Sequence, residues 1–196
     1  GAALPPVQSW EIIDGNLPGL NVLAEIAWHI EQRAGTADPV TAVAMTVMPG
    51  PQLVSAVPLA QRVKARFPRV PIIWGGNFGS LYPAPVLNAP YVDWIVRGQG
   101  ERSFIELLEA IAGRRDPHSV AGIGFRAADG SHVLTPERPW LGPNELPAPP
   151  YHKIDVAQYL QPTFLGQRSG VYQASIGCPF GCNFCGVIAV FGRREK

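Results

Sequence analysis

Stretches with the apolar pattern of a β-strand alternate with stretches that have the apolar pattern of a helix along the first part of the chain. The strand-like runs are short and rich in β-branched residues, and they are Trp10–Asp14, Val40–Met48, Val70–Trp74 and Val92–Val96. The helix-like stretches are Leu23–Ala34, Gln52–Phe67 and a helix that begins at Glu101. This alternation favours an α/β fold, in which an open parallel sheet carries helices on both faces.

The pattern changes after this alternating part. Two short apolar runs flank Asp129-Gly130, a turn signal that predicts a β-hairpin from Ile123–Ala127 and His132–Thr135. A proline-rich stretch follows and predicts an extended linker. Beyond it, Tyr151–Leu160 predicts a short helix or turn. We therefore expect a first domain over residues 1–140, a linker over 141–170 and the start of a second domain over 171–196.

The composition excludes several classes of protein. The 196 residues carry 16 Lys and Arg against 15 Asp and Glu, a net charge of +1, so the chain offers no basic field for nucleic acid. No apolar run approaches the length that spans a membrane, and the first residues lack the pattern of a signal peptide. The three cysteines are clustered and not distributed as a disulfide framework. We therefore expect a cytoplasmic protein without stable membrane insertion.

The cysteines form a C-x3-C-x2-C pattern at Cys178, Cys182 and Cys185, directly after an apolar run, Val171–Ile176, that predicts a buried strand. Three closely spaced thiolates suit a soft-metal centre. A structural zinc site needs a fourth ligand, and no histidine follows the last cysteine. A cubane iron–sulfur cluster on three thiolates would leave one iron open to a further ligand. The spacing favours such a cluster, while zinc and unreactive thiols stay open.

With Phe184 directly before the last cysteine, this segment resembles the signature of the radical S-adenosylmethionine (SAM) enzymes. The resemblance implies that Cys178, Cys182 and Cys185 hold a 4Fe-4S cluster and that Phe184 belongs to the SAM-binding segment. In that family the fourth iron binds SAM, and the reduced cluster cleaves it to a 5′-deoxyadenosyl radical. A reductant such as flavodoxin or ferredoxin is therefore an implied partner.

The predicted parallel strands end in short stretches that contain glycine: Thr46–Gly50, Gly75–Asn77 and Gly98–Gly100. Ligands of open parallel sheets bind beyond the carboxyl ends of the strands, and glycines there let a bulky ligand approach the backbone. Plain tight turns remain an alternative explanation. A nicotinamide site is disfavoured, because Ser103 stands where a dinucleotide-binding motif has its third glycine.

This part of the chain resembles the cobalamin-binding domain that precedes the radical module in one large subclass of that family. The likeness rests on Gly75-Gly76 after a strand, on Val92–Val96 leading into Gly98–Glu101, on the helix around Phe104–Leu108 and on the Leu146–Pro149 linker. The resemblance implies that the strand ends contact cobalamin through Thr46, Gly75, Gly76, Asn77, Gly98, Gln99, Gly100 and Glu101. That subclass commonly has His where this chain has Asn77, and Glu where it has Gln99.

Classical cobalamin domains carry D-x-H-x-x-G, whose histidine is the lower ligand of cobalt. This pattern does not occur here, and the four histidines, His29, His118, His132 and His152, lie outside the strand-end stretches. The radical subclass typically binds cobalamin without base or histidine below the cobalt. The resemblance therefore implies base-off binding without a histidine ligand.

The two resemblances together imply a cobalamin-dependent radical SAM enzyme that methylates an unactivated carbon of a small-molecule substrate. Radical ring closure or rearrangement, and a non-catalytic cobalamin- or metal-binding module, are the alternatives. Since 196 − 185 leaves 11 residues after the last cysteine, too few for a radical SAM barrel, we expect the chain to be the amino-terminal part of a longer protein and inactive alone.

Overall fold

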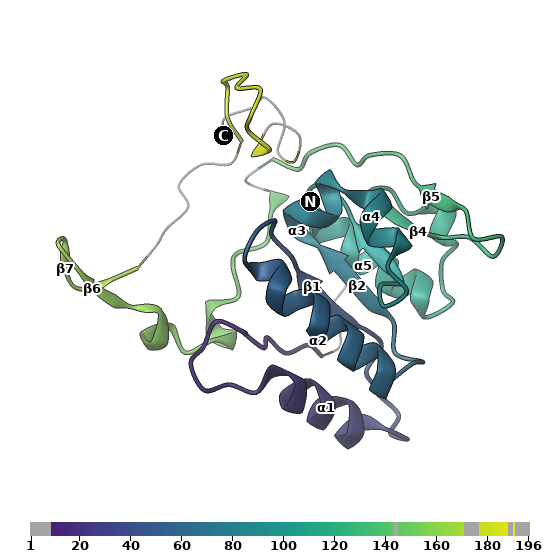
Figure 1. Cartoon of the computed structure of the whole chain (residues 1–196), viewed down its shortest axis with the longest axis horizontal. Helices are drawn as coiled ribbons and strands as arrows, with labels where there is room; N and C mark the ends of the chain where they lie inside the picture. Colours follow the sequence, from purple (N-terminus) through teal and green to yellow (C-terminus); the bar gives the residue numbers. More distant parts are fainter. Residues whose placement is uncertain (1–8, 143–144, 171–176, 188–189, 191–196) are drawn as a thin grey trace.

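The computed structural model describes residues 9–142, 145–170, 177–187 and 190. Its main feature is a five-stranded sheet in the order β1-β2-β3-β4-β5. The strands are β1 (Val43–Thr46), β2 (Ile72–Gly75), β3 (Trp94–Val96), β4 (Ile123–Arg126) and β5 (His132–Leu134). Figure 1 shows the sheet with its helices packed around it.

The first three strands are parallel, and the last two are antiparallel. Met45 of β1 lies opposite Trp74 of β2, and Ile73 of β2 lies opposite Trp94 of β3. The antiparallel hairpin of β4 and β5 pairs with β3, with Ile123 opposite Val96. The predicted parallel α/β fold and the predicted hairpin are both confirmed, and the hairpin extends the same sheet.

Five helices accompany the sheet: α1 (Val22–Arg33), α2 (Gln52–Arg66), α3 (Gly76–Leu81), α4 (Pro83–Asn88) and α5 (Gly100–Ile111). Successive residues of a strand point to opposite faces of a sheet. Ile72 and Trp74 pack in one core with apolar residues of α1, α2 and α4, whereas Ile73 packs in a second core with Leu107 of α5. Helices therefore cover both faces, as predicted.

Local sequence explains how the helices begin. The side chain of Asn21 accepts a hydrogen bond from the backbone N–H of Ala24 and caps α1. The predicted helix of 52–67 begins at Gln52, so Pro58 lies inside α2 and not in its first turn.

The core supplies much of the stability of the fold. The buried Ile72 side chain, like others of its size, stabilises the fold by about 1.5–3 kcal/mol.

The predicted strand at Trp10–Asp14 is wrong, because these residues form neither strand nor helix. In the described part of the chain no strand pairs with them, and an apolar pattern without a neighbouring strand cannot form a ladder. Side chains from a distant segment bind this stretch instead. Lys153 Nζ donates to Trp10 O at 3.2 Å, and the Tyr159 hydroxyl donates to Asp14 Oδ2 at 2.9 Å.

That distant segment confirms the predicted turn and adds a hairpin that was not predicted. Two short 3-10 helices, η3 (Tyr151–Lys153) and η4 (Val156–Tyr159), are followed by β6 (Gln161–Thr163) and β7 (Gly166–Ser169). The hairpin of β6 and β7 stands away from the main sheet (Figure 1). The strand predicted for Val171–Ile176 lies outside the described residues. Across the described residues, every helix is too short or too polar to traverse a lipid bilayer.

Candidate ligand site at the carboxyl ends of the parallel strands

The carboxyl ends of β1, β2 and β3 lie along one edge of the sheet, because the three strands are parallel. The eight residues predicted to contact cobalamin all lie at these ends or in the first residues of the helices that follow. Thr46 is exposed, and the residues of the other two ends are half-buried. The structure therefore brings the predicted residues to one edge, which we call the ligand edge.

Gly76 joins the first two strand ends. Val47 N donates to Gly75 O at 3.0 Å, and Phe78 N donates to Val47 O at 3.0 Å. The φ of Gly76 is +79°, and a Cβ there would lie 3.1 Å from both Thr46 Cγ2 and Val47 O. This position thus needs glycine for its backbone conformation and for the close approach of the neighbouring loop.

Ser80 joins the second and third strand ends. Its hydroxyl donates to Gly76 O at 2.8 Å and accepts a hydrogen bond from Gly98 N at 2.9 Å. Gly98 has a φ of +65°, and nothing lies within 4 Å of the position its Cβ would take. The sequence carried no signal for Ser80, because its partner Gly98 is distant in the chain.

Gln99 faces the linker. Its Oε1 accepts a hydrogen bond of 2.6 Å from Leu141 N, and Leu141 is buried. The half-buried side chain of Asn77 makes no hydrogen bond to another described residue. Two buried polar atoms of the third strand end, Arg97 Nε and Glu101 Oε2, also have no hydrogen-bond partner among the described residues. The ligand edge therefore offers polar groups that a bound amide-rich ligand could satisfy.

The cysteine loop contacts the helix that begins at the second strand end. A Cβ on Gly186, next to Cys185, would lie 3.2 Å from Leu81 Cδ1, so this loop touches the carboxyl end of α3. The short helix α3 begins at Gly76 in the ligand edge and ends at Leu81 against the cysteine loop. Neither this contact nor Leu81 was predicted, and only the three-dimensional fold reveals them.

The cysteines are free thiols. Cys182 is exposed, Cys178 and Cys185 are half-buried, and Cys185 N donates to Cys182 O at 3.2 Å. Phe184 is 88% exposed, so its ring is open to a further contact. Within the described ranges the structure holds no group of three His, Cys, Asp or Glu side chains arranged to bind a metal ion. Assignment of Cys178, Cys182 and Cys185 to a cluster stays a prediction.

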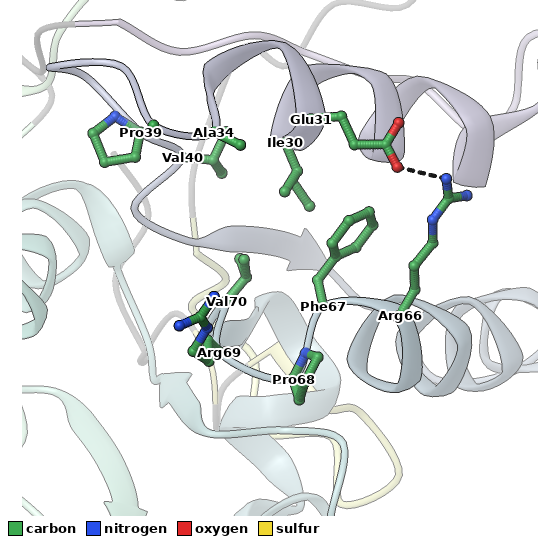
Figure 2. Close-up of a pocket in the computed structure, with 11 residues that line it drawn as sticks. Ile30, Glu31, Ala34, Pro39, Val40, Arg66, Phe67, Pro68, Arg69 and Val70 are labelled. Atoms are coloured by element: carbon green, nitrogen blue, oxygen red, sulfur yellow. Dashed lines mark hydrogen bonds and ion pairs between the residues drawn. The ribbon is translucent and has the colours of Figure 1, made fainter.

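A separate groove of about 450 Å³ lies at the opposite edge of the sheet (Figure 2). Its walls are the last turns of α1 and α2 and the residues that lead into β1 and β2, among them Ile30, Val40 and Val70. Arg66 Nη2 and Glu31 Oε1 form an ion pair of 2.5 Å across it. Because the groove faces away from the ligand edge, it does not belong to the candidate site.

The sequence of this chain is similar to those of several known proteins. A family model described as the B12 binding domain matches residues 8–108. The chain is 31% identical over 139 residues to an anaerobic magnesium-protoporphyrin IX monomethyl ester cyclase of Rubrivivax gelatinosus, covering 69% of this chain and 25% of that protein. It is 29% identical over 132 residues to the cobalamin-dependent radical SAM methyltransferase TokK of Streptomyces tokunonensis, covering 65% of this chain and 19% of that protein.

The fold resembles a solved structure over most of its length. The radical SAM methyltransferase TsrM from Kitasatospora setae superposes with a TM-score of 0.59 at 18% identity, covering 89% of this chain and 34% of TsrM. At this identity the likeness shows the fold alone. The chain spans about a quarter of the length of the cyclase of Rubrivivax gelatinosus, since it covers 25% of it.

Proposed function

Because the chain belongs to the B12-binding domain family, and its relatives include cobalamin-dependent radical SAM enzymes, we propose that it contributes the cobalamin site and the cluster-binding cysteines of such an enzyme. The reaction we propose is methylation of an unactivated carbon in a small-molecule substrate. The enzyme would work in the reducing cytoplasm with flavodoxin or ferredoxin as reductant. No role in binding nucleic acid is part of this proposal.

The ligand edge has the properties that a cobalamin site needs. Gly98 leaves open space beside the backbone, whereas the space beside Gly76 is filled by Thr46 and Val47. Asn77 and Glu101 supply polar atoms without partners in the described part of the chain. These residues, with Thr46 and Gly100, would hold cobalamin, which supplies a transferable methyl group when bound.

The residue types of the cysteine loop suit a cluster that leaves one iron open, although the structure does not gather the three thiols at one point. Cys178, Cys182 and Cys185 would be its three thiolate ligands, and Phe184 would line the SAM side of the loop. The chain's own part in the reaction is to hold these thiolates beside the helix that begins in the ligand edge.

One observation carries the proposal most strongly: α3 touches both parts of the site. Its first residue, Gly76, lies in the ligand edge, and its last, Leu81, packs against Gly186 of the cysteine loop. A helix rises about 1.5 Å per residue, so a six-residue helix spans about one nanometre. The two parts of the proposed site are therefore neighbours on one short helix.

Ring closure is the second candidate reaction. The relative that is 31% identical over 139 residues is a cyclase, and the ligand edge does not distinguish methyl transfer from cyclisation. The substrate would decide between the two, and its binding residues are not among those assigned here.

The proposal is tested by a matched pair of glycine substitutions. Gly98 and Gly113 both have a positive φ, of +65° and +73°, and both have open space around the Cβ position. Gly113 follows α5 at the other end of that helix from the ligand edge. Leucine at either position should cost a similar free energy of folding, about 1–2 kcal/mol. Only Gly98→Leu should weaken binding of hydroxocobalamin, by at least about tenfold, or about 1.4 kcal/mol.

Binding of hydroxocobalamin to the 196-residue chain can be followed by its visible absorption spectrum, and folding by urea denaturation. Equal affinities of the two variants, or no binding by the unmodified chain, would contradict the cobalamin assignment.

A further inference from the structure

We propose that Gln99 is a positioning residue for the linker and not a ligand contact. Its side chain fastens the segment of residues 135–142, which we call the strap, to the loop between β3 and α5. The strap begins the linker that runs through β6 and β7 to the cysteine loop, so fastening it fixes where that linker leaves the sheet. The role in the reaction rests on the proposed function, whereas the fastening itself does not.

The strap is attached at its beginning through the backbone. Pro136 O accepts a hydrogen bond from Gly122 N at 2.8 Å, and Thr135 O accepts one from Arg97 Nη1 at 3.3 Å. The Thr135 hydroxyl accepts a hydrogen bond from Ile123 N at 3.0 Å and donates one to Ile123 O at 3.1 Å. These contacts continue the β5 strand and fix where the strap starts.

The middle of the strap is attached through Arg138. Its Nε donates to the hydroxyl of Ser103 at 2.9 Å, and its guanidinium also pairs with the carboxylate of Glu106. Ser103 is fully buried, and its hydroxyl donates to Ala121 O at 2.7 Å. Arg138 therefore anchors the strap to α5 by charge-assisted hydrogen bonds in a site largely closed to water.

The far end of the strap depends on Gln99. Its amide oxygen is 2.6 Å from Leu141 N, and Leu141 is only 8% exposed. Loss of this acceptor would leave the buried N–H of Leu141 without a partner, which disfavours the closed position of the strap. The bond to Leu141 N turns the side chain toward the strap, while the amide oxygen keeps a second lone pair and the amide nitrogen keeps its two N–H donors.

The test measures how often the strap opens. Chymotrypsin cleaves after Trp140 only when the strap leaves the surface, whereas Phe164 is 97% exposed at the tip of the β6–β7 hairpin and serves as an internal reference. In the ligand-free 196-residue chain, Gln99→Ala should raise the rate of cleavage after Trp140, relative to Phe164, by about tenfold. Gln99→Glu keeps an acceptor oxygen and should stay within about twofold of the unmodified chain.

Gln52 provides a matched control. Its Oε1 accepts a hydrogen bond of 2.6 Å from Met48 N, at the first strand end of the same edge. Gln52→Ala removes a comparable bond that does not touch the strap, so cleavage after Trp140 should not change. Hydroxocobalamin binding by Gln99→Ala should stay within about threefold of the unmodified chain, since the strap remains closed most of the time.

Four results would overturn the positioning role. The first is a rate of cleavage after Trp140 in Gln99→Ala equal to that of the unmodified chain. The second is a rate in Gln52→Ala raised as much as in Gln99→Ala, and the third is a rate in Gln99→Glu as high as in Gln99→Ala. A loss of hydroxocobalamin affinity in Gln99→Ala without faster cleavage would instead make Gln99 a ligand contact. If the unmodified chain binds no hydroxocobalamin, the proposed function fails, while the cleavage rates still decide the role of Gln99.

Discussion

At the scale of single residues, sequence predicted positions better than contacts. Gly75, Gly76 and Gly98 could be singled out because glycine after a strand has few other uses than turns and ligand approach. Their surroundings could not be predicted, since Ser80 reaches Gly98 across 18 positions of the chain. Gln99 lies where it was predicted to lie, yet its side chain is bound to Leu141 of the linker.

Gly76 should be the least replaceable of the strand-end glycines. A Cβ there would be 3.1 Å from a neighbouring backbone oxygen, and the residue has a φ of +79°. We expect Gly76→Ala to lower the free energy of unfolding by about 2–3 kcal/mol, from backbone strain and from displacement of Val47. Gly113→Ala, with a φ of +73° and no nearby atoms, should cost only about 1 kcal/mol.

Urea denaturation of both variants measures the difference directly. Equal losses would mean that the loop after β1 moves aside without cost, and that the contact of Gly76 with Val47 is not a constraint.

At the scale of elements, apolar periodicity predicted α1, α2, α5 and the core strands because each packs in a core, whereas α3 and α4, of six residues each, are too short to show it. The same pattern predicted a strand at Trp10–Asp14 that does not form, because no described strand lies beside these residues to share backbone hydrogen bonds with them. The hairpin of β6 and β7 escaped prediction for the opposite reason. Its strands are mostly exposed and polar, with Gln161 and Arg168 among them, so they carry no apolar alternation.

The contact between η4 and the stretch of Trp10–Asp14 should depend on pH. The backbone N–H of Asn16, and to a smaller extent the Tyr159 hydroxyl, hold the pKa of Asp14 below its ordinary value. Its contribution to stability is therefore present above the unfolded pKa of about 3.9 and is lost as the pH falls through the lower folded pKa. The hydrogen bond between Tyr159 and Asp14 also raises the pKa of Tyr159. The contribution of Tyr159 to stability is therefore present below its unfolded pKa of about 10 and is lost as the pH rises through the higher folded pKa.

Titration by NMR tests this assignment. Tyr159→Phe should raise the pKa of the Asp14 carboxyl but leave it below the ordinary value, because the bond from Asn16 remains. An Asp14 pKa that does not respond to Tyr159→Phe would show that the two side chains are apart in solution.

At the scale of the whole molecule, the sequence predicted an α/β domain joined by a linker to a cysteine loop. It could not predict that the linker is fixed to α5 through Arg138, since the partners of Arg138 lie 35 and 32 positions away. Nor could it predict the contact of Leu81 with Gly186. The four histidines lie on α1, on the short 3-10 helix η1 (Pro117–Ser119), on β5 and on η3, outside the three strand ends of the ligand edge.

The cysteines should act as one unit. In a protein that contains this whole chain, anaerobic reconstitution with iron and sulfide should give about four irons per chain. Cys182→Ala should abolish both the cluster and the cleavage of SAM, because a missing thiolate leaves a second iron without its ligand. Asn183→Ala, at the exposed neighbouring position, should change neither. Iron analysis and 5′-deoxyadenosine production measure the two effects, and a site filled by zinc alone would refute the cluster assignment.

The antiparallel hairpin of β4 and β5 has a practical consequence for experiments. β4 runs antiparallel to β3, and β5 runs antiparallel to β4, so β5 has the same direction as β3. The end of β5 at Leu134 therefore lies at the same edge as the end of β3 at Val96. The turn between the strands, at Asp129 and Gly130, therefore sits at the far edge, where open space surrounds the Gly130 Cβ position. A fluorophore or surface tether attached at this turn would report on the molecule, or immobilise it, from the side opposite the ligand edge.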